Sequence, residues 1–343
     1  MRNTLAATAA SIVAFITSST AMAGKDLDAI KARGALNCGV GIGTAGFMLA
    51  DSQGKWRGLS VDVCRAVAAA IFGDAEKVKY APLTSQQRFT AVQSGEVDIV
   101  MGNATWTLTR DTALGLDFTG VYYYDGQSFL VPKTLGVKSA RELGGATVCV
   151  APGTTTELNL ADYFRANKMT FKPVVIEKVD EIRAAFFAGR CDVYTTDASS
   201  LAATRAANVP PPRTFDDFVI LPEIISKEPL GPVVRHGDSQ FADIVRWALY
   251  AMVEAEEHGI TSKNVDEMLK SDNPAIKRIL GVTPGMGEAL GIDERWVYNI
   301  VKQVGNYGES FDRNVGKDSP LKIDRGLNRL WSQGGLQYSP PFR

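Results

Sequence analysis

The sequence has few histidines, no strong excess of either charge, and no long apolar run after its first 23 residues. With two histidines in 343 residues, a Ser-His-Asp or Cys-His catalytic arrangement is hard to build. The pI is about 6.2, which argues against nucleic acid as a partner, because proteins that bind it carry a strongly basic face. No run of about 18 uninterrupted apolar residues occurs, so no membrane-spanning helix and no stable membrane insertion are predicted.

The chain also lacks the paired ligands of common metal sites, since it contains no CxxC and no HxxxH. One cofactor-like motif is present: residues 41–46 fit GxGxxG after a predicted strand, and Asp62 follows 21 residues after Gly41. A dinucleotide site needs this motif to open a helix, whereas here a turn at 51–54 follows and the helix is predicted to begin near Ser60. We therefore expect no cofactor and no metal, and interpret the segment as a loop that lines a cleft.

The first 23 residues have the composition of an export signal. Arg2 is their only charged residue, residues 5–16 are mainly apolar and rich in alanine, and Ala21-Met22-Ala23 fits the small-x-small cleavage rule. A membrane anchor is the weaker interpretation, because the apolar run is too short for the roughly 30 Å core of a bilayer. We predict cleavage after Ala23 and export, with 36 basic and 38 acidic residues left once Arg2 is removed.

Two stretches of the chain, residues 94–105 and 188–199, follow the same pattern. Each reads as a helix ended by glycine, then an aspartate, a short apolar strand and a small polar cluster. Ligands bind at the carboxyl ends of strands in open α/β sheets, so the pattern places Asn103 and Asp197 at equivalent positions. The repeat predicts two similar lobes with a ligand cleft between them.

Strand-like runs alternate with helical runs along the rest of the chain, which indicates the α/β class. A strongly amphipathic helix is predicted from Asp238 to near Gly259. The remainder, residues 260–343, reads as helix and loop without a recognisable motif. We expect it to pack on the first lobe.

Four cysteines lie in the predicted mature chain: Cys38, Cys64, Cys149 and Cys191. In an exported protein they predict two disulfides, with three possible pairings. The repeat favours pairing within lobes, because Cys38 and Cys149 each end the first strand of a lobe, which gives Cys38–Cys64 and Cys149–Cys191. In the loop-entropy model each bond contributes about 3–4 kcal/mol.

The segment after the first repeat strand could bind a carboxylate. Arg110 ends the run Thr105-Trp106-Thr107-Leu108-Thr109-Arg110, and its planar guanidinium can hold a carboxylate through two charge-assisted hydrogen bonds. Thr105 could add a hydroxyl. The alternative is an exposed arginine at a turn, the usual place of that residue.

The second lobe offers complementary groups. Thr154 and Glu157 fit a capping box, so the helix that begins near Thr155 presents free N–H groups to an anion. Asp197, at the end of the second repeat strand, could neutralise an ammonium group. Helix capping is the alternative role for Thr154 and Asp197. Taken together, these groups specify the zwitterion of a free α-amino acid, with the carboxylate on Arg110, the Thr105 hydroxyl and the Thr155 amide, and the ammonium on Asp197.

At these residues the chain resembles the periplasmic solute-binding proteins of polar amino-acid ABC transporters. The resemblance runs from about residue 36 to residue 259. Residues 58–63 resemble the family's Gly-aromatic-acid-x-acid signature but depart from it at Leu59 and Ser60. The other matching positions are Gly95, Asp98, Thr105, Arg110, Asp117, Phe118, Thr119, Tyr123, Gly153, Thr154, Thr155 and Asp197. The spacing from Arg110 to Asp117 is about two residues longer than the family's usual one.

The resemblance implies a two-lobed, periplasmic-binding-protein-like α/β fold in which each lobe is a doubly wound sheet. Two hinge crossings, near 124–127 and 224–229, would join the lobes. The chain would then divide into a first lobe over 24–125, a second lobe over 126–225, and a return to the first lobe with a C-terminal helical extension over 226–343.

The resemblance also implies a function. Residues 225–235 and the long extension resemble the general L-amino-acid-binding subgroup, which implies a periplasmic receptor of broad specificity that delivers L-amino acids to an inner-membrane ABC permease. Relatives that select basic side chains have an acid where this chain has Gly41, so no preference for lysine or arginine is built in there. We expect a monomer, with Phe47 and Trp106 flanking the ligand side chain, although either aromatic could belong to the core.

An enzyme on the same fold is the alternative function. A cyclohexadienyl-type dehydratase, acting on prephenate or arogenate, would need a general acid in the cleft. The matching segments offer no further Glu or Lys for that role, and Asp197 is better used as an ammonium partner. We therefore expect a binding protein rather than an enzyme.

Overall fold

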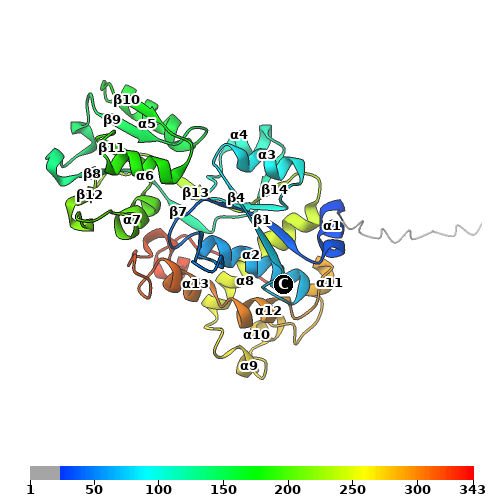
Figure 1. Ribbon diagram of the computed structural model, residues 1–343. Coiled ribbons are helices and arrows are strands. Elements are labelled where there is room, and N and C mark those ends of the chain that lie inside the picture. The colour runs from blue at the N-terminus through cyan, green and yellow to red at the C-terminus, as the bar shows by residue number, and fades with distance from the viewer. Residues whose placement is uncertain (1–23) are drawn as a thin grey trace, which may run out of the picture.

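The chain forms two lobes, each built on its own five-stranded sheet (Figure 1). The structure is a computed structural model that describes residues 24–343, so the predicted export signal and its cleavage site lie outside the described residues. No helix among residues 24–343 is long and apolar enough to cross a membrane. The mixture of strands and helices in both lobes confirms the predicted α/β class.

The two sheets have the same strand arrangement. The strands of the first lobe are β1 (Leu36–Gly41), β4 (Val78–Leu83), β5 (Ile99–Met101), β6 (Leu116–Phe118) and β14 (Val233–Arg235), in the order β4-β1-β5-β14-β6. The strands of the second lobe are β8 (Gln127–Pro132), β9 (Thr147–Val150), β10 (Lys172–Val175), β11 (Val193–Asp197) and β12 (Phe218–Ile220), in the order β10-β9-β11-β8-β12. In each sheet the first three strands are parallel and the last two alternate in direction. β5 and β11 therefore hold equivalent central positions, as the repeat predicted.

Helices cover both faces of each sheet, with a separate apolar core on each face. The first lobe contains α1 (Lys25–Arg33), α2 (Leu59–Phe72), α3 (Gln87–Ser94), α4 (Leu108–Ala113) and α8 (Ser239–Glu257), together with a short hairpin of β2 (Leu49–Ala50) and β3 (Trp56–Arg57). The second lobe contains α5 (Thr155–Ala166), α6 (Val179–Phe187) and α7 (Ala198–Ala207). Burial of apolar side chains on both faces explains why the strands are largely apolar rather than alternating.

The chain passes from one sheet to the other twice. It leaves the first lobe through β7 (Tyr123–Asp125) and returns through β13 (Glu228–Leu230), and these two strands pair antiparallel with each other. The expected domain limit at residue 125 is the last residue of β7, and the one at residue 225 lies between β12 and β13. A paired two-stranded connection of this kind can bend while its backbone hydrogen bonds remain satisfied.

The two disulfides lie within lobes, as predicted. Cys38 in β1 is bonded to Cys64 in α2, and Cys149 in β9 is bonded to Cys191 just before β11. All four cysteines are buried. Each bond therefore ties a strand to a neighbouring element of its own lobe and leaves relative motion of the lobes unconstrained.

The C-terminal extension packs on the first lobe and shares its core. It contains α9 (Val265–Met268), α10 (Pro274–Ile279), α11 (Met286–Leu290), α12 (Trp296–Gln303) and α13 (Tyr307–Asn314). Figure 1 shows these helices below the first sheet, with α12 and α13 packed against α2 and α8. The extension also reaches the first connection between the lobes, where Asn328 bonds both the N–H and the C=O of Tyr124 at 2.7 and 3.1 Å.

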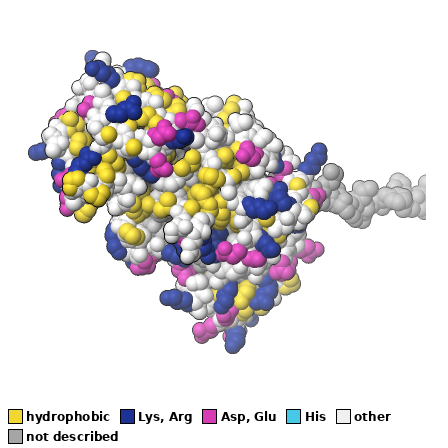
Figure 2. Space-filling view, viewed as in Figure 1, with side chains coloured by type: hydrophobic (Ala, Val, Ile, Leu, Met, Phe, Trp, Pro, Cys, Tyr) yellow, Lys and Arg dark blue, Asp and Glu magenta, His cyan; other side chains and the backbone are white. Residues whose placement is uncertain are grey.

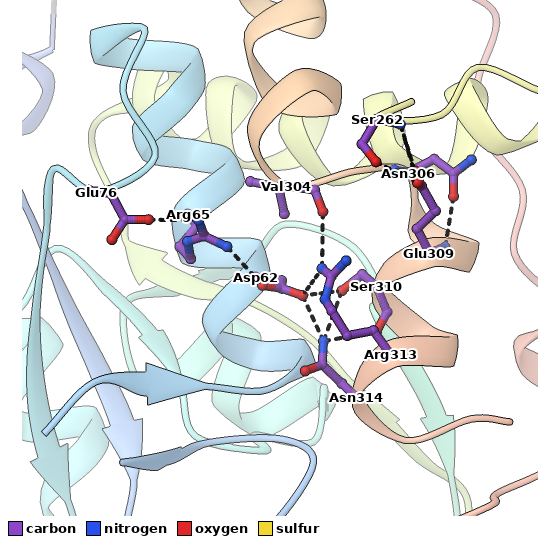
Figure 3. Close-up of polar contacts among 10 residues, drawn as sticks. All are labelled: Asp62, Arg65, Glu76, Ser262, Val304, Asn306, Glu309, Ser310, Arg313 and Asn314. Atoms are coloured by element: carbon purple, nitrogen blue, oxygen red, sulfur yellow. Dashed lines mark hydrogen bonds and ion pairs between the residues drawn. The ribbon is translucent and has the colours of Figure 1, made fainter. Parts of the chain in front are cut away.

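Asp62 joins α2 to this extension. Its carboxylate accepts hydrogen bonds from Ser310 Oγ at 2.6 Å and Asn314 Nδ2 at 2.7 Å, and it pairs with Arg313 at 2.5 Å (Figure 3). Arg65 contacts the same carboxylate from one turn further along α2. Asp62 is therefore a structural residue that holds the C-terminal extension against α2.

The surface carries charges of both signs. On the face drawn in Figure 2, Lys and Arg side chains are interspersed with Asp and Glu over both lobes. On this face, charges of both signs are mixed and do not form a single basic stripe.

Candidate functional site

A polar cavity lies between the lobes, at the carboxyl ends of β1, β5, β9 and β11. Asn103, Thr105, Thr154, Thr155 and Asp197 all line it, so the structure brings together five of the eight residues predicted to bind ligand. This is the edge at which open α/β sheets bind ligands. The cavity therefore joins the polar clusters that the two repeats predicted separately.

Asp197 presents an uncommitted carboxylate. It ends β11 and precedes α7, yet its side chain makes no capping hydrogen bond to that helix. It is 7% exposed, and burial together with the nearby Asp125 and Glu228 raises its pKa well above the usual range. Asp197 therefore does not cap α7, which was the alternative role that the sequence left open. Its carboxylate is available to a cation in the cavity.

Asn103 holds the equivalent position after β5 but is committed to its own lobe. Its backbone is left-handed, with φ of 49°, a conformation that asparagine tolerates better than most residues. Its Oδ1 accepts a hydrogen bond from Tyr122 at 2.7 Å, and the Tyr122 hydroxyl lies 3.1 Å from Ser60 Oγ. These bonds fix the turn that carries the chain from β5 to Thr105.

Arg110 lies immediately behind the cavity wall. It is 8% exposed, it donates from Nη1 to the Thr105 carbonyl at 3.0 Å, and it stacks on Phe89 at 4.9 Å. Burial lowers its pKa, while the charges of Glu228 and Asp197 act in the opposite direction. No carboxylate among the described residues forms an ion pair with its guanidinium, so its charge remains available to an anionic ligand.

Arg88 is a cavity residue that the sequence analysis missed. It lies in the first turn of α3, 6% exposed, and donates from Nη1 to the carbonyls of Gly102 and Asn103 at 2.7 and 3.2 Å. Burial and the neighbouring Arg110 lower its pKa to about 9. Its Nε is buried without a partner in the described chain. One sequence feature could have identified Arg88 as a site residue: it lies at the start of a helix that follows the carboxyl end of a predicted strand, β4.

The start of α5 supplies backbone donors from the second lobe. Thr154 caps this helix by accepting from the Glu157 N–H at 3.1 Å, as predicted. Glu157 bonds the N–H of Gly153 rather than that of Thr154, so the expected capping box is only half formed. The first-turn N–H groups of a helix lack intrahelical partners and favour an anion.

Neither Phe47 nor Trp106 lines the cavity, which corrects their expected place beside the ligand side chain. Phe47 is fully buried in the first lobe, with its ring edge-on to Tyr123 at 5.1 Å. Trp106 is 37% exposed and stacks on Phe118 at 5.9 Å. Phe47 therefore belongs to the core of the first lobe, and Trp106 stays partly exposed to solvent while its ring stacks on Phe118.

The lobes touch each other across the mouth of the cavity. Arg183 of the second lobe donates from Nη1 to the Gly43 carbonyl at 2.8 Å, and Thr84 of the first lobe donates to Glu177 at 2.7 Å. Gly43 belongs to the glycine-rich loop, whose neighbours Gly41, Ile42 and Thr44 line the cavity. This loop therefore faces the cleft, as interpreted from the sequence.

A comparison with protein-family models identifies the family of this chain. The bacterial extracellular solute-binding proteins, family 3, match residues 36–265, which is most of the described chain. The chain belongs to this family. The match ends near α9, so most of the C-terminal extension lies outside it.

Relatives of known name match between 92% and 100% of this chain. The general L-amino acid-binding periplasmic protein of Rhizobium johnstonii is 54% identical over 345 residues and matches 100% of both chains. The glutamate/glutamine/aspartate/asparagine-binding protein of Rhodobacter capsulatus is 56% identical and matches 92% of this chain and 93% of the relative. A periplasmic binding protein from Brucella ovis, solved with glutathione bound, is 57% identical over 92% of this chain and 99% of that chain, with a TM-score of 0.89.

Two residues of the family signature, one divergent and one retained, have structural roles in this chain. Ser60, which stands where the resemblance leads one to expect an acid, hydrogen-bonds Tyr122 and through it supports Asn103. Asp62, the retained acid, holds the C-terminal extension. Both residues therefore act behind the cavity and neither lines it.

Proposed function

We propose that this protein is a periplasmic receptor of broad specificity that binds L-amino acids and delivers them to an ABC transporter permease. One observation carries the proposal: the uncommitted carboxylate of Asp197 from one lobe and the guanidinium of Arg88 from the other line one cavity, and the guanidinium of Arg110 lies directly behind its wall. Burying a charged ligand is costly unless each charge is paired. A zwitterion satisfies both sets of groups at once.

In the proposed complex, the α-carboxylate lies between Arg110 and the first-turn N–H groups of α5, and the α-ammonium lies at Asp197. A guanidinium offers several donors in one plane, which suits a carboxylate. Because one set of groups belongs mainly to the first lobe and the other to the second, the ligand favours the closed arrangement of the lobes over an open one.

Arg88 gives the proposed receptor a preference among side chains. It is a buried cation with an unpartnered Nε, so ligands whose side chains end in an acceptor gain a hydrogen bond that alanine cannot make. A Rhodobacter relative named for acidic residues and their amides is consistent with that preference. Gly41, in place of an acid, provides no matching anion for lysine or arginine.

The location and the partner of the protein follow from the same proposal. Export with cleavage after Ala23 would place the mature chain in the periplasm, and delivery would require an inner-membrane ABC permease. We propose that the protein acts there as a monomer, since a single chain supplies both halves of the site. The relatives' names favour this receptor over the dehydratase on the same fold.

A calorimetric screen of the mature protein against the twenty L-amino acids tests the proposal. We expect binding of several amino acids, strongest for glutamate, glutamine, aspartate or asparagine, and weaker binding of lysine and arginine. Failure of every amino acid to bind would contradict the proposal. Incubation with prephenate and arogenate, followed by mass spectrometry, is expected to return both compounds unchanged, whereas conversion of either would favour the dehydratase.

A further inference from the structure

A fully buried carboxylate lies directly behind two of the cavity's threonines. Glu228 is the first residue of β13, and it does not itself line the cavity. Its Oε2 atom accepts hydrogen bonds from Thr105 Oγ1 at 2.5 Å and from Thr155 Oγ1 at 2.8 Å. Thr105 belongs to the first lobe and Thr155 to the second, so one oxygen atom binds a hydroxyl from each lobe.

The second oxygen of Glu228 is equally engaged. Oε1 accepts from Asn159 Nδ2 at 2.7 Å and from Ser226 Oγ at 2.6 Å. An ionised carboxylate has about four acceptor positions and no donor, so these four donors are the complete set of partners for the charged form. No cationic side chain of the described residues forms an ion pair with Glu228, and its negative charge lies instead near Arg110.

We propose that Glu228 is a positioning residue that fixes the direction of the Thr105 and Thr155 hydroxyl groups. A threonine hydroxyl has a single proton, and a bond to a carboxylate is stronger than a bond between neutral groups. Both protons therefore point at Glu228, and both oxygens present only lone pairs to the cavity. The two hydroxyls accept hydrogen bonds from a ligand and donate none.

The consequence is a reassignment of Thr105 within the site. Its hydroxyl serves the α-ammonium end of the ligand, together with Asp197, rather than the α-carboxylate end expected from the sequence. The Thr105 and Thr155 oxygens are 3.2 Å apart, so one ammonium group can contact both. The α-carboxylate is left to Arg110 and the backbone donors of α5. This inference rests on the proposed function.

A mutant cycle tests whether Glu228 acts through the two hydroxyls. Glu228→Gln removes the charge that orients the protons, and Thr105→Val together with Thr155→Val removes both oriented hydroxyls while keeping the side-chain shapes. Titration with L-glutamine is expected to give about a tenfold loss of affinity for Glu228→Gln and for each single threonine variant. Glu228→Gln combined with both threonine changes is expected to bind within about twofold of the Thr105→Val, Thr155→Val variant, because both hydroxyls through which Glu228 acts are already gone. Losses that multiply, or an unchanged affinity in Glu228→Gln, would overturn the role of Glu228.

Asn159→Ala provides a second, milder perturbation should Glu228→Gln fail to fold. It removes one donor to Oε1 and leaves Glu228 in place. We expect about a threefold loss of L-glutamine affinity that disappears in the background with both Thr105→Val and Thr155→Val, and a loss that persists there would overturn the proposal. Thermal unfolding of each variant shows that the fold is kept. If the wild type binds no amino acid, the proposed function fails; if it binds but the losses multiply, only the role of Glu228 fails.

Discussion

The two repeat strands end at equivalent places in their sheets but present opposite chemistry to the cavity. After β5 the chain turns through Asn103, whose side chain is held by Tyr122, and the guanidiniums of Arg88 and Arg110 gather behind that turn. After β11 the chain presents Asp197, whose side chain makes no capping hydrogen bond to α7. The two lobes thus share one strand arrangement but differ in the residues that follow β5 and β11. The first lobe offers positive charge there, and the second lobe offers negative charge. A ligand with both charges needs both lobes.

Removal of the positive half should have the largest effect. Arg110→Ala is expected to weaken binding of every amino acid by more than about 100-fold, because a buried charge-assisted anchor for the shared α-carboxylate is lost. Calorimetry with each ligand that the wild type binds measures this. Arg165→Ala is the matched control, since that side chain is 78% exposed, and it should bind like the wild type. Retained affinity for any one amino acid in Arg110→Ala would place the anchor elsewhere.

Removal of the negative half should cost somewhat less. Asp197→Asn keeps the size of the side chain and its acceptor oxygen but loses the charge opposite the α-ammonium, and we expect about a 30-fold loss of affinity. The loss should be similar for all ligands, because the ammonium is common to them. A loss confined to some side chains would instead assign Asp197 to the side-chain end of the ligand.

Acid should weaken binding through the same carboxylate. Burial raises the pKa of Asp125 to about 6, and burial together with Asp125 and Glu228 raises that of Asp197, with Arg88 and Arg110 acting in the opposite direction. A raised pKa means that the free protein keeps a proton on this pair at mildly acidic pH, and that proton must leave before the ammonium can bind. Affinity should therefore fall by up to about tenfold per unit as the pH drops below about 6.

Asp197→Asn distinguishes protonation of this carboxylate from acid-induced unfolding of the whole protein. Asp197→Asn should show a flatter profile between pH 8 and pH 5 than the wild type, measured by titration with L-glutamine in buffers of constant ionic strength. An equally steep profile in the variant would mean that another group titrates.

Loss of the second guanidinium should change selectivity more than affinity. Arg88→Gln is expected to weaken L-glutamine and L-glutamate by about tenfold and L-alanine by less than about threefold, because alanine has no side-chain acceptor. The ratio of the two affinities is the measurement. Equal losses for alanine and glutamine would show that Arg88 only supports the turn at Gly102 and Asn103.

The C-terminal extension should affect stability and leave affinity nearly unchanged. Asp62→Asn removes a buried charge that binds Ser310, Arg313 and Asn314, and should lower the free energy of unfolding by about 2 kcal/mol. Asp162→Asn, at a side chain that is 72% exposed, should leave the unfolding free energy unchanged. Urea titration measures both. A large loss of ligand affinity in Asp62→Asn would instead couple the extension to the site.

Much of the architecture could be predicted because local sequence patterns determine it. The repeat around Asn103 and Asp197 predicted two strands at equivalent positions in their sheets, and the structure has them there. The positions of Cys38 and Cys149 in the first strand of each lobe predicted disulfides within lobes, which the structure also shows. Thr154 was predicted as a helix cap from its spacing to Glu157, and it is one. These features depend on residues close in the chain or on a repeated pattern.

The missed features depend on contacts between distant segments. Glu228 meets Thr105 and Thr155 across 123 and 73 residues, and nothing in its local sequence indicates a buried carboxylate. In the sequence, Arg88 looks like any other arginine in a helix. Only its tertiary contact with the turn after β5 distinguishes it. Phe47 failed as a site residue for the same reason, since whether an aromatic ring faces a cleft or a core is decided by tertiary packing.

A crystal structure of the mature protein with L-glutamine would test the division of charge between the lobes most directly. The account predicts the α-carboxylate of the ligand within hydrogen-bond distance of Arg110, and the α-ammonium against Asp197 and the Thr105 and Thr155 oxygens. A ligand bound in the reverse orientation, or one whose ammonium is held by groups of the first lobe alone, would contradict it.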